Sequence, residues 1–90
     1  IQRSNIIVTD NVEQAKIECG DLIDPIEHGY ASWDQVHNLA EVVAGATFGR
    51  RKPTDITLFE SQGLAIEDIS VAIRVVENAK AHGIGKDIPI

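Results

Sequence analysis

The corner Glu60-Ser61-Gln62-Gly63 carries the groups best suited to chemistry in this chain. It separates a short apolar run, residues 55–59, from the long amphipathic pattern that follows. Open α/β sheets bind ligands at such corners, outside the carboxyl ends of their strands. A hydroxyl there can hold a polar group of a ligand, and Gly63 allows a tight turn and a close approach of the backbone. Ser61 equally suits the simpler role of N-cap for the following helix, and the two roles are compatible.

Other charged and aromatic side chains suit structural roles better than catalytic ones. Glu67 and Asp68 fall in the first turn of the last predicted helix, where carboxylates complement the helix dipole. No partner for acid–base chemistry is identifiable for either of them. The Gly-Arg-Arg-Lys loop, residues 49–52, has the charge to hold a cofactor phosphate, but in an acidic chain we expect a solvated loop. Tyr30 and Trp33 flank a predicted helix start, and we expect them to pack there rather than to stack on a ligand.

Metal binding and thiol chemistry are not indicated by the sequence. His28, His37 and His82 lack the spacing of metal ligands, and Cys19 completes no zinc pattern with them. We therefore expect solvated or capping histidines, with His82 favouring the end of a helix. The neighbours of Cys19 supply no base or cation that would activate a thiolate, so a buried structural thiol is predicted.

The elements that must position the corner begin with a strand at residues 5–9. This continuous apolar, β-branched run is typical of a parallel strand that is covered on both faces. Asp10 follows as the expected N-cap of a helix, with Glu13 completing a capping box. One buried face of that helix is predicted to contain Val12, Ala15, Cys19 and Leu22. The Asp24-Pro25 pair is expected to end the helix.

A second helix is predicted from another capping box, formed by Ser32 and Gln35. Its buried stripe would consist of Val36, Leu39, Ala40 and Val43, and Gly45 would end it. Residues 55–59 form the second predicted strand. A last helix is expected from Leu64 to about His82, with Gly83 and Gly85 as stop signals.

The predicted order is therefore β-α-α-β-α, an α/β arrangement in which the two strands lie parallel with a right-handed crossover. The apolar first strand expects neighbours on both sides, and this order supplies at most one. Since the sequence also contains no Met, we expect a piece of a longer protein whose remaining strands lie upstream. An apolar edge left uncovered in this way would allow self-association.

Composition limits the kinds of partner. Ninety residues make one domain at most, and 43% hydrophobic residues are typical of a globular chain. A net charge of −6 disfavours nucleic acid and anionic membranes as partners. No apolar segment approaches the roughly 20 residues of a membrane span. A single cysteine excludes an internal disulfide and predicts a reducing, cytoplasmic setting.

The segments NIIVTDNVEQAKIECGDL, LAEVVAG and DITLFESQGLAIEDISVA resemble the C-terminal part of the ornithine cyclodeaminase/mu-crystallin family. The resemblance covers nearly all 90 residues and is most specific at residues 56–68. It implies a partial Rossmann-type fold that supplies the last two parallel strands of an NAD(P)-binding domain, with residues 1 to about 63 in that domain. Residues from about 64 to 83 would form a helix that returns to a substrate and dimerisation domain.

The resemblance also implies an activity for the longer protein. The first candidate is conversion of an amino acid such as L-ornithine to proline and ammonia by hydride transfer with NAD or NADP. The alternatives are an amino-acid dehydrogenase, a ketimine reductase, or a mu-crystallin-like protein that binds NADP(H) and a small ligand. A homodimer is expected.

By the same resemblance, Ser61 lies beside the nicotinamide, so Ser61, Gln62 and Gly63 are the expected cofactor-binding residues. Many relatives have Val, Leu or Thr where this chain has Gln62. The glycine-rich phosphate loop and the acidic residue that holds a ribose are absent from the sequence. The catalytic Asp and the substrate-binding Arg and Lys of the family match nothing in these 90 residues. We therefore expect no catalytic residue in this chain and no catalysis by the chain alone.

Overall fold

The computed structural model describes all 90 residues and contains a three-stranded parallel sheet. The strands are β1 (Ile6–Thr9), β2 (Val36–Asn38) and β3 (Thr57–Glu60), in the spatial order β2-β1-β3. The predicted α/β class is confirmed, and so are two parallel strands near their predicted positions. The prediction of only two strands was wrong, because β2 lies where a helix was expected.

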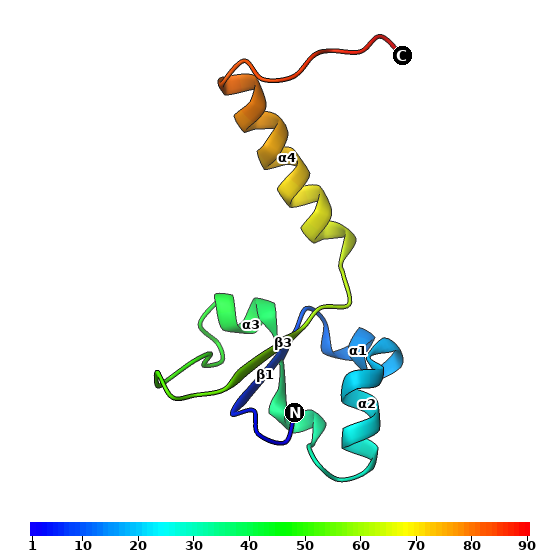
Figure 1. Cartoon of the computed structure of the whole chain (residues 1–90), viewed down its shortest axis with the longest axis vertical. Helices are drawn as coiled ribbons and strands as arrows, with labels where there is room; N and C mark the ends of the chain where they lie inside the picture. Colours follow the sequence, from blue (N-terminus) through cyan, green and yellow to red (C-terminus); the bar gives the residue numbers. More distant parts are fainter.

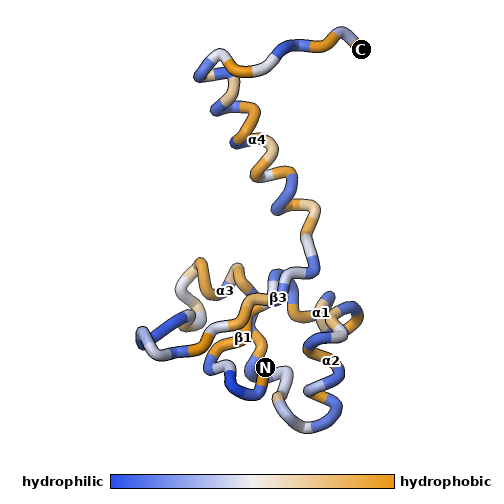
Figure 2. Tube along the Cα trace, viewed as in Figure 1, coloured by the Kyte–Doolittle hydropathy of each residue, from blue (hydrophilic) through white to orange (hydrophobic).

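β1 is the central strand, as its apolar sequence requires. Ile7 pairs with Val36 of β2 on one side and with Leu58 of β3 on the other. Ile7 and Val8 are buried, and Figure 2 shows apolar residues along this part of the chain. The neighbours that the sequence demanded for β1 are therefore supplied within the chain, one of them by a segment that carried no strand signal.

Two short helices, α1 (Val12–Glu18) and α2 (Gly20–Glu27), cover one face of the sheet (Figure 1). Their buried residues Ala15, Cys19 and Leu22 pack with Ile7 and Val36 into the core. The predicted burial of Ala15, Cys19 and Leu22 is thus confirmed, whereas Val12 is only partly buried. The prediction of one helix through these residues was wrong, because the chain forms two helices that meet at Cys19. The predicted break at Pro25 was wrong, because α2 continues for two residues beyond it. Pro25 has no backbone N–H, so the carbonyl of Asp21 lacks its usual partner within the helix. Because Asp21 is an exposed residue, water can take the place of that partner.

The capping box of Ser32 and Gln35 is present, but it caps only the short 3-10 helix η1 (Trp33–Gln35). The chain then extends as β2, and Val36 is 5% exposed against Ile7 instead of lying on a helix. A capping box specifies where a helix starts and not how long it is, and a β-branched Val gains more from the sheet. The expected second helix is therefore reduced to α3 (Leu39–Val43). It ends as predicted before Gly45, whose φ of 78° suits the stop.

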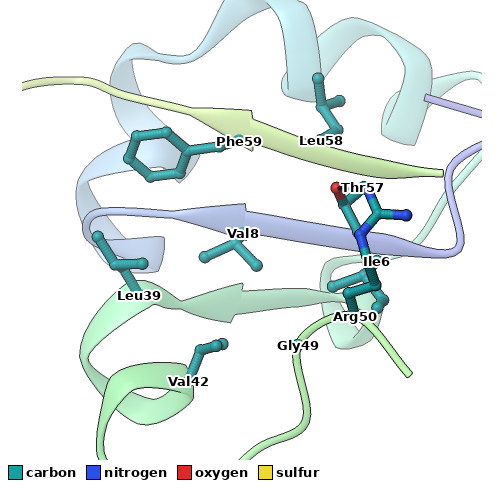
Figure 3. Close-up of a pocket in the computed structure, with 9 residues that line it drawn as sticks. All are labelled: Ile6, Val8, Leu39, Val42, Gly49, Arg50, Thr57, Leu58 and Phe59. Carbon is teal, nitrogen blue, oxygen red and sulfur yellow. Dashed lines mark hydrogen bonds between the residues drawn. The ribbon is translucent and has the colours of Figure 1, made fainter. Parts of the chain in front are cut away.

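The second face of the sheet is covered only in part. α3 and the loop of residues 46–54 leave a hollow of about 270 Å³ on it. Val8, Leu39 and Val42 line this hollow between the sheet and α3 (Figure 3). Phe59 of β3, which also lines it, is 51% exposed. The two faces are therefore unequal, with the well-packed core under α1 and α2.

The last helix, α4 (Ala65–Ala81), projects away from the sheet (Figure 1), and the molecule measures 55 × 30 × 20 Å. Its bounds agree with the predicted helix to within a residue or two. Figure 2 shows apolar residues along α4. Their side chains are largely exposed, among them those of Ile66, Ile69, Ile73 and Val76. No helix in the structure combines the length and the apolar character needed to cross a membrane.

The packing under α1 and α2 generates a stability prediction. Replacing Leu22, which is fully buried, by Ala should lower the free energy of unfolding by about 2–5 kcal/mol, because a cavity remains in the core. Ile17 is 81% exposed on the neighbouring helix, so Ile17→Ala should change stability by no more than about 0.5 kcal/mol. Urea unfolding followed by circular dichroism measures both. Equal losses in the two variants would contradict the assignment of the core.

Candidate functional site

The carboxyl ends of β1 and β3 lie side by side and form the candidate site. The two strands are parallel, with Thr9 opposite Glu60. Each strand therefore ends at the same edge of the sheet, and the residues that follow, Asp10 and Ser61, meet there. The structure thus brings all three predicted cofactor-binding residues to one corner, together with a carboxylate that the sequence had assigned elsewhere.

The Asp10 carboxylate is the centre of a hydrogen-bond network at this corner. Its Oδ2 accepts from Ser61 Oγ at 2.9 Å, from Gln62 N at 2.9 Å and from Gly63 N at 2.7 Å. Its Oδ1 accepts from Asn11 N at 3.1 Å, from Gln62 N at 3.1 Å and from Thr9 Oγ1 at 3.3 Å. One side chain at the end of β1 therefore fixes the whole turn that leads out of β3.

The predicted capping role of Asp10 was wrong. Asn11 is the N-cap of α1, and its side-chain oxygen accepts from Gln14 N at 2.9 Å. Ser61 does not cap α4 either, because the N-cap position there is Leu64, which makes no side-chain cap. A different signal in the sequence pointed to Asp10. A carboxylate directly after a buried central strand lies at the edge where neighbouring parallel strands also end.

Charge at the corner follows from these contacts. Asp10 is only 6% exposed, and burial alone would raise the pKa of its carboxyl group. Hydrogen bonds from two backbone amides and two hydroxyls favour the charged form, and their combined effect is larger. The pKa of Asp10 therefore lies below its ordinary value, and the carboxylate is ionised at neutral pH.

Ser61 and Gly63 give this corner an open side. Ser61 belongs to the exposed residues although its hydroxyl is bound to Asp10. Gly63 has a φ of 83°, which side chains rarely adopt, and a Cβ placed there would meet no atom within 4 Å. The predicted tight turn at Gly63 is confirmed. The corner therefore combines a fixed hydroxyl with unobstructed space, which is what a flat polar ligand group needs.

An apolar hollow of about 390 Å³ adjoins this corner, between α3 and the start of α4. Asp10 and Glu67 are its charged lining residues, and the apolar ones include Leu39, Val43 and Leu64. Glu67 is half-buried, so the first turn of α4 contributes to the surroundings of the corner as well as to its own dipole. The hollow places an apolar surface next to the Asp10 carboxylate that holds Ser61.

The remaining candidates from the sequence lie elsewhere. Arg50 of the basic loop hydrogen-bonds to Thr57 Oγ1 at 3.0 Å, at the amino end of β3 and so at the opposite edge of the sheet. His28 and His82 each approach a carbonyl at the end of their own helix, at 2.8 Å. No three His, Cys, Asp or Glu side chains gather closely enough to hold a metal ion.

Comparison with known proteins identifies relatives of this chain. The sequence model of the ornithine cyclodeaminase/mu-crystallin family matches residues 1–83. The chain is 37% identical, over 98% of its length, to a Δ(1)-pyrroline-2-carboxylate reductase of Bacillus cereus, and 41% identical, over 91%, to an alanine dehydrogenase of Archaeoglobus fulgidus. It spans about a quarter of each of these proteins, 27% and 26%.

A solved structure shows the same arrangement. The Δ(1)-pyrroline-2-carboxylate reductase of Thermococcus litoralis, in complex with NADH and L-proline, superposes with a TM-score of 0.77 at 40% sequence identity. The match covers 97% of this chain and 27% of the reductase chain. The fold described above is therefore the fold of the corresponding part of a reductase that binds NADH.

The buried carboxylate generates a pH prediction. Because folding lowers the pKa of Asp10, its contribution to stability is full above the unfolded value near 3.8 and is lost as the pH falls through the folded value. The urea midpoint of the protein should thus fall once the pH drops below about 4. Asp10→Asn should lower the midpoint at pH 7 and reduce the further fall in acid.

A matched control is Asp21→Asn, which alters an exposed carboxylate in the first turn of α2. It should keep the acid dependence of the unchanged protein. Part of that dependence should remain in Asp10→Asn, because the pKa of Asp55 is also lowered, by the backbone N–H groups of Arg51 and Lys52. Identical pH profiles for Asp10→Asn and Asp21→Asn would show that Asp10 is not the buried charge described here.

Proposed function

The chain belongs to the ornithine cyclodeaminase/mu-crystallin family, and on this premise we propose that it forms the nicotinamide side of an NAD(P)-binding domain in a longer oxidoreductase. The observation that carries the proposal is the exposed Ser61 hydroxyl, held by Asp10 at the carboxyl edge of a parallel sheet. Ligands of open α/β sheets bind at this edge. The similarity to a reductase that is in complex with NADH supports the same assignment.

The residues at the corner fit one end of a dinucleotide. In this proposal Ser61, Gln62 and Gly63 contact the nicotinamide group. Gly63, whose positive φ favours glycine, has no side chain and so leaves that surface free. The chain contains no glycine-rich phosphate loop, so the grip on the pyrophosphate comes from another part of the longer protein. Residues 1 to about 63 would complete the cofactor domain.

α4 has a separate place in this proposal. Its exposed apolar side chains, such as Ile69 and Ile73, need cover that these 90 residues do not provide. We assign that cover to the substrate domain of the longer protein, to which residues from about 64 to 83 return. A homodimer and a cytoplasmic setting belong to the same proposal.

The reaction that suits this family setting is the interconversion of an α-imino acid and the corresponding α-amino acid. In the reductive direction the imine carbon gains a hydride and the nitrogen gains a proton, while NAD(P)H becomes NAD(P)⁺. The bound dihydronicotinamide supplies the hydride. The part of this chain is to orient the nicotinamide at Ser61 and to keep water away with the apolar hollow beside it. Reductase or dehydrogenase activity of this kind is supported by the names of the relatives.

Cyclodeamination of L-ornithine, the first candidate from the sequence, uses the same hydride transfer twice and stays a prediction. Two assays on the full-length protein separate the candidates. Oxidation of NAD(P)H by Δ(1)-pyrroline-2-carboxylate indicates the reductase, and release of ammonia from L-ornithine with catalytic NAD indicates the cyclodeaminase. Tight NADPH binding with neither activity would favour the mu-crystallin type.

Residues 1–90 alone should bind the cofactor weakly. The hydrogen bonds and helix dipole that hold a pyrophosphate contribute much of dinucleotide affinity, and they are outside this chain. Calorimetric titration of the 90-residue protein with NADH and with NADPH should give dissociation constants well above the micromolar range. Micromolar binding would mean that the chain carries a phosphate site of its own.

In the full-length protein, Ser61→Ala should weaken NAD(P)H binding while leaving the fold intact. One neutral hydrogen bond contributes about 0.5–1.5 kcal/mol, so the dissociation constant should rise about 2- to 12-fold. Calorimetry measures the affinity and urea unfolding measures the stability. Ser70→Ala is the matched control, because Ser70 bonds only to the Ile66 carbonyl on the exposed helix α4. Equal affinities in both variants would remove Ser61 from the cofactor site.

A further inference from the structure

The hydrogen bond between Ser61 and Asp10 has a direction, and that direction decides what the corner can bind. We propose that Asp10 is a positioning residue that makes Ser61 a hydrogen-bond acceptor, so that the corner binds the amino group of the nicotinamide carboxamide and not its carbonyl oxygen. This inference rests on the proposed function and specifies how the same site recognises its ligand.

The first step is a count of protons. An ionised carboxylate accepts hydrogen bonds and donates none, whereas a serine hydroxyl has a single proton. Ser61 Oγ lies 2.9 Å from Asp10 Oδ2, so the proton between them is that of Ser61. The serine oxygen then has only lone pairs left for a ligand. The low pKa of Asp10 supports this count, since the carboxylate stays charged at neutral pH.

The second step concerns the other donors of the turn. The backbone N–H groups of Gln62 and Gly63 also point to Asp10, at 2.9 and 2.7 Å from Oδ2. A carbonyl oxygen that approached this turn would therefore find its nearest N–H groups already engaged. Ser61 is an exposed residue, while Asp10 is 6% exposed, so the carboxylate lies on the buried side of the turn and Ser61 lies on its exposed side.

The third step is the chemistry of the ligand. A carboxamide has an NH₂ donor on one side and a carbonyl acceptor on the other. A serine oxygen that offers only lone pairs accepts from the NH₂ group, and this contact selects one of the two orientations about the bond that joins the carboxamide to the ring. Asp10 thus acts through Ser61 on a group that it does not itself touch, and it would set the orientation of the carboxamide on the ring.

The variant that releases Ser61 is Asp10→Ala, because it removes both oxygens. Asp10→Asn is the conservative comparison. Three donors converge on each oxygen, and those at Oδ2 are closer, at 2.7–2.9 Å, than those at Oδ1, at 3.1–3.3 Å. We therefore expect the amide oxygen to occupy the Oδ2 position and the NH₂ group to lie at the Oδ1 position. Ser61 therefore still donates to residue 10 in Asp10→Asn, although the protein is less stable.

The experiment compares two cofactors in the full-length protein by calorimetry. One is NADH, and the other is reduced 3-acetylpyridine adenine dinucleotide, which keeps the carbonyl but has a methyl group in place of NH₂. If the protein binds NADPH, the 2′-phosphorylated forms of both cofactors are used instead. The readout is the dissociation constant of the analogue divided by that of NADH. The unchanged protein should give a ratio of about 2–12, the range that one neutral hydrogen bond supports.

The variants should separate into two groups. Asp10→Asn should keep a ratio above about 2, because Ser61 remains an acceptor. Asp10→Ala and Ser61→Ala should both bring the ratio close to 1. In Asp10→Ala the freed hydroxyl can donate to the carbonyl that both cofactors share, and in Ser61→Ala the contact is absent. A general loss of stability would weaken both cofactors equally and would not move the ratio.

Two outcomes overturn the inference and leave the proposed function standing. One is a ratio near 1 in the unchanged protein although Ser61→Ala weakens NADH binding. The other is a ratio that persists in Asp10→Ala. If Asp10→Ala does not fold, the unchanged protein, Ser61→Ala and Asp10→Asn still decide the direction of the bond. An NADH affinity that is unaffected by Ser61→Ala overturns the proposed cofactor site itself.

Discussion

The buried carboxylate of Asp10 is the contact on which the arrangement at the carboxyl edge of the sheet depends. It accepts hydrogen bonds from three residues that lie 51 to 53 positions away in the sequence. Burying a charge is costly unless its hydrogen bonds are satisfied, and here the donors come from the last residue of β1 and from the turns that leave β1 and β3. The same carboxylate therefore joins the two strand ends and, in the proposed cofactor site, determines which atoms of Ser61 remain for a ligand. Structure and recognition depend on one side chain.

The sheet that holds this carboxylate is unequally supported. α1 and α2 cover one face, where Ala15 and Leu22 are fully buried, whereas the other face leaves Phe59 half-exposed. α4 makes no extensive contact with either face and extends from the corner itself (Figure 1). Because α4 (Ala65–Ala81) begins two residues after Gly63, the turn that Asp10 holds also sets the point at which this helix leaves the sheet.

Sequence reasoning succeeded where one signal decides one feature. The apolar run at residues 5–9 identified the central strand, and Gly45 and Gly83 marked the ends of α3 and α4. It failed where one local sequence pattern is compatible with two different structures. The capping box at Ser32 starts a 3-10 turn and not a long helix, so the strand at residues 36–38 was missed. Such a three-residue strand is specified mainly by pairing with β1, which no local pattern contains.

The error at Asp10 shows why the site was found only in part. The sequence Asp-Asn-Val-Glu satisfies the pattern of a capping box, and Asn11, one residue later, takes the capping role. The Asp10 side chain therefore points toward the end of β3, because its hydrogen-bond donors Ser61, Gln62 and Gly63 lie there, far along the chain. Ser61, Gln62 and Gly63 could be identified as a group because they are contiguous. The residue that decides how they bind could be identified only once parallel pairing had placed the two strand ends together. Contiguous residues thus point to a place for a ligand, and the contact between distant residues reveals which atoms are left to hold it.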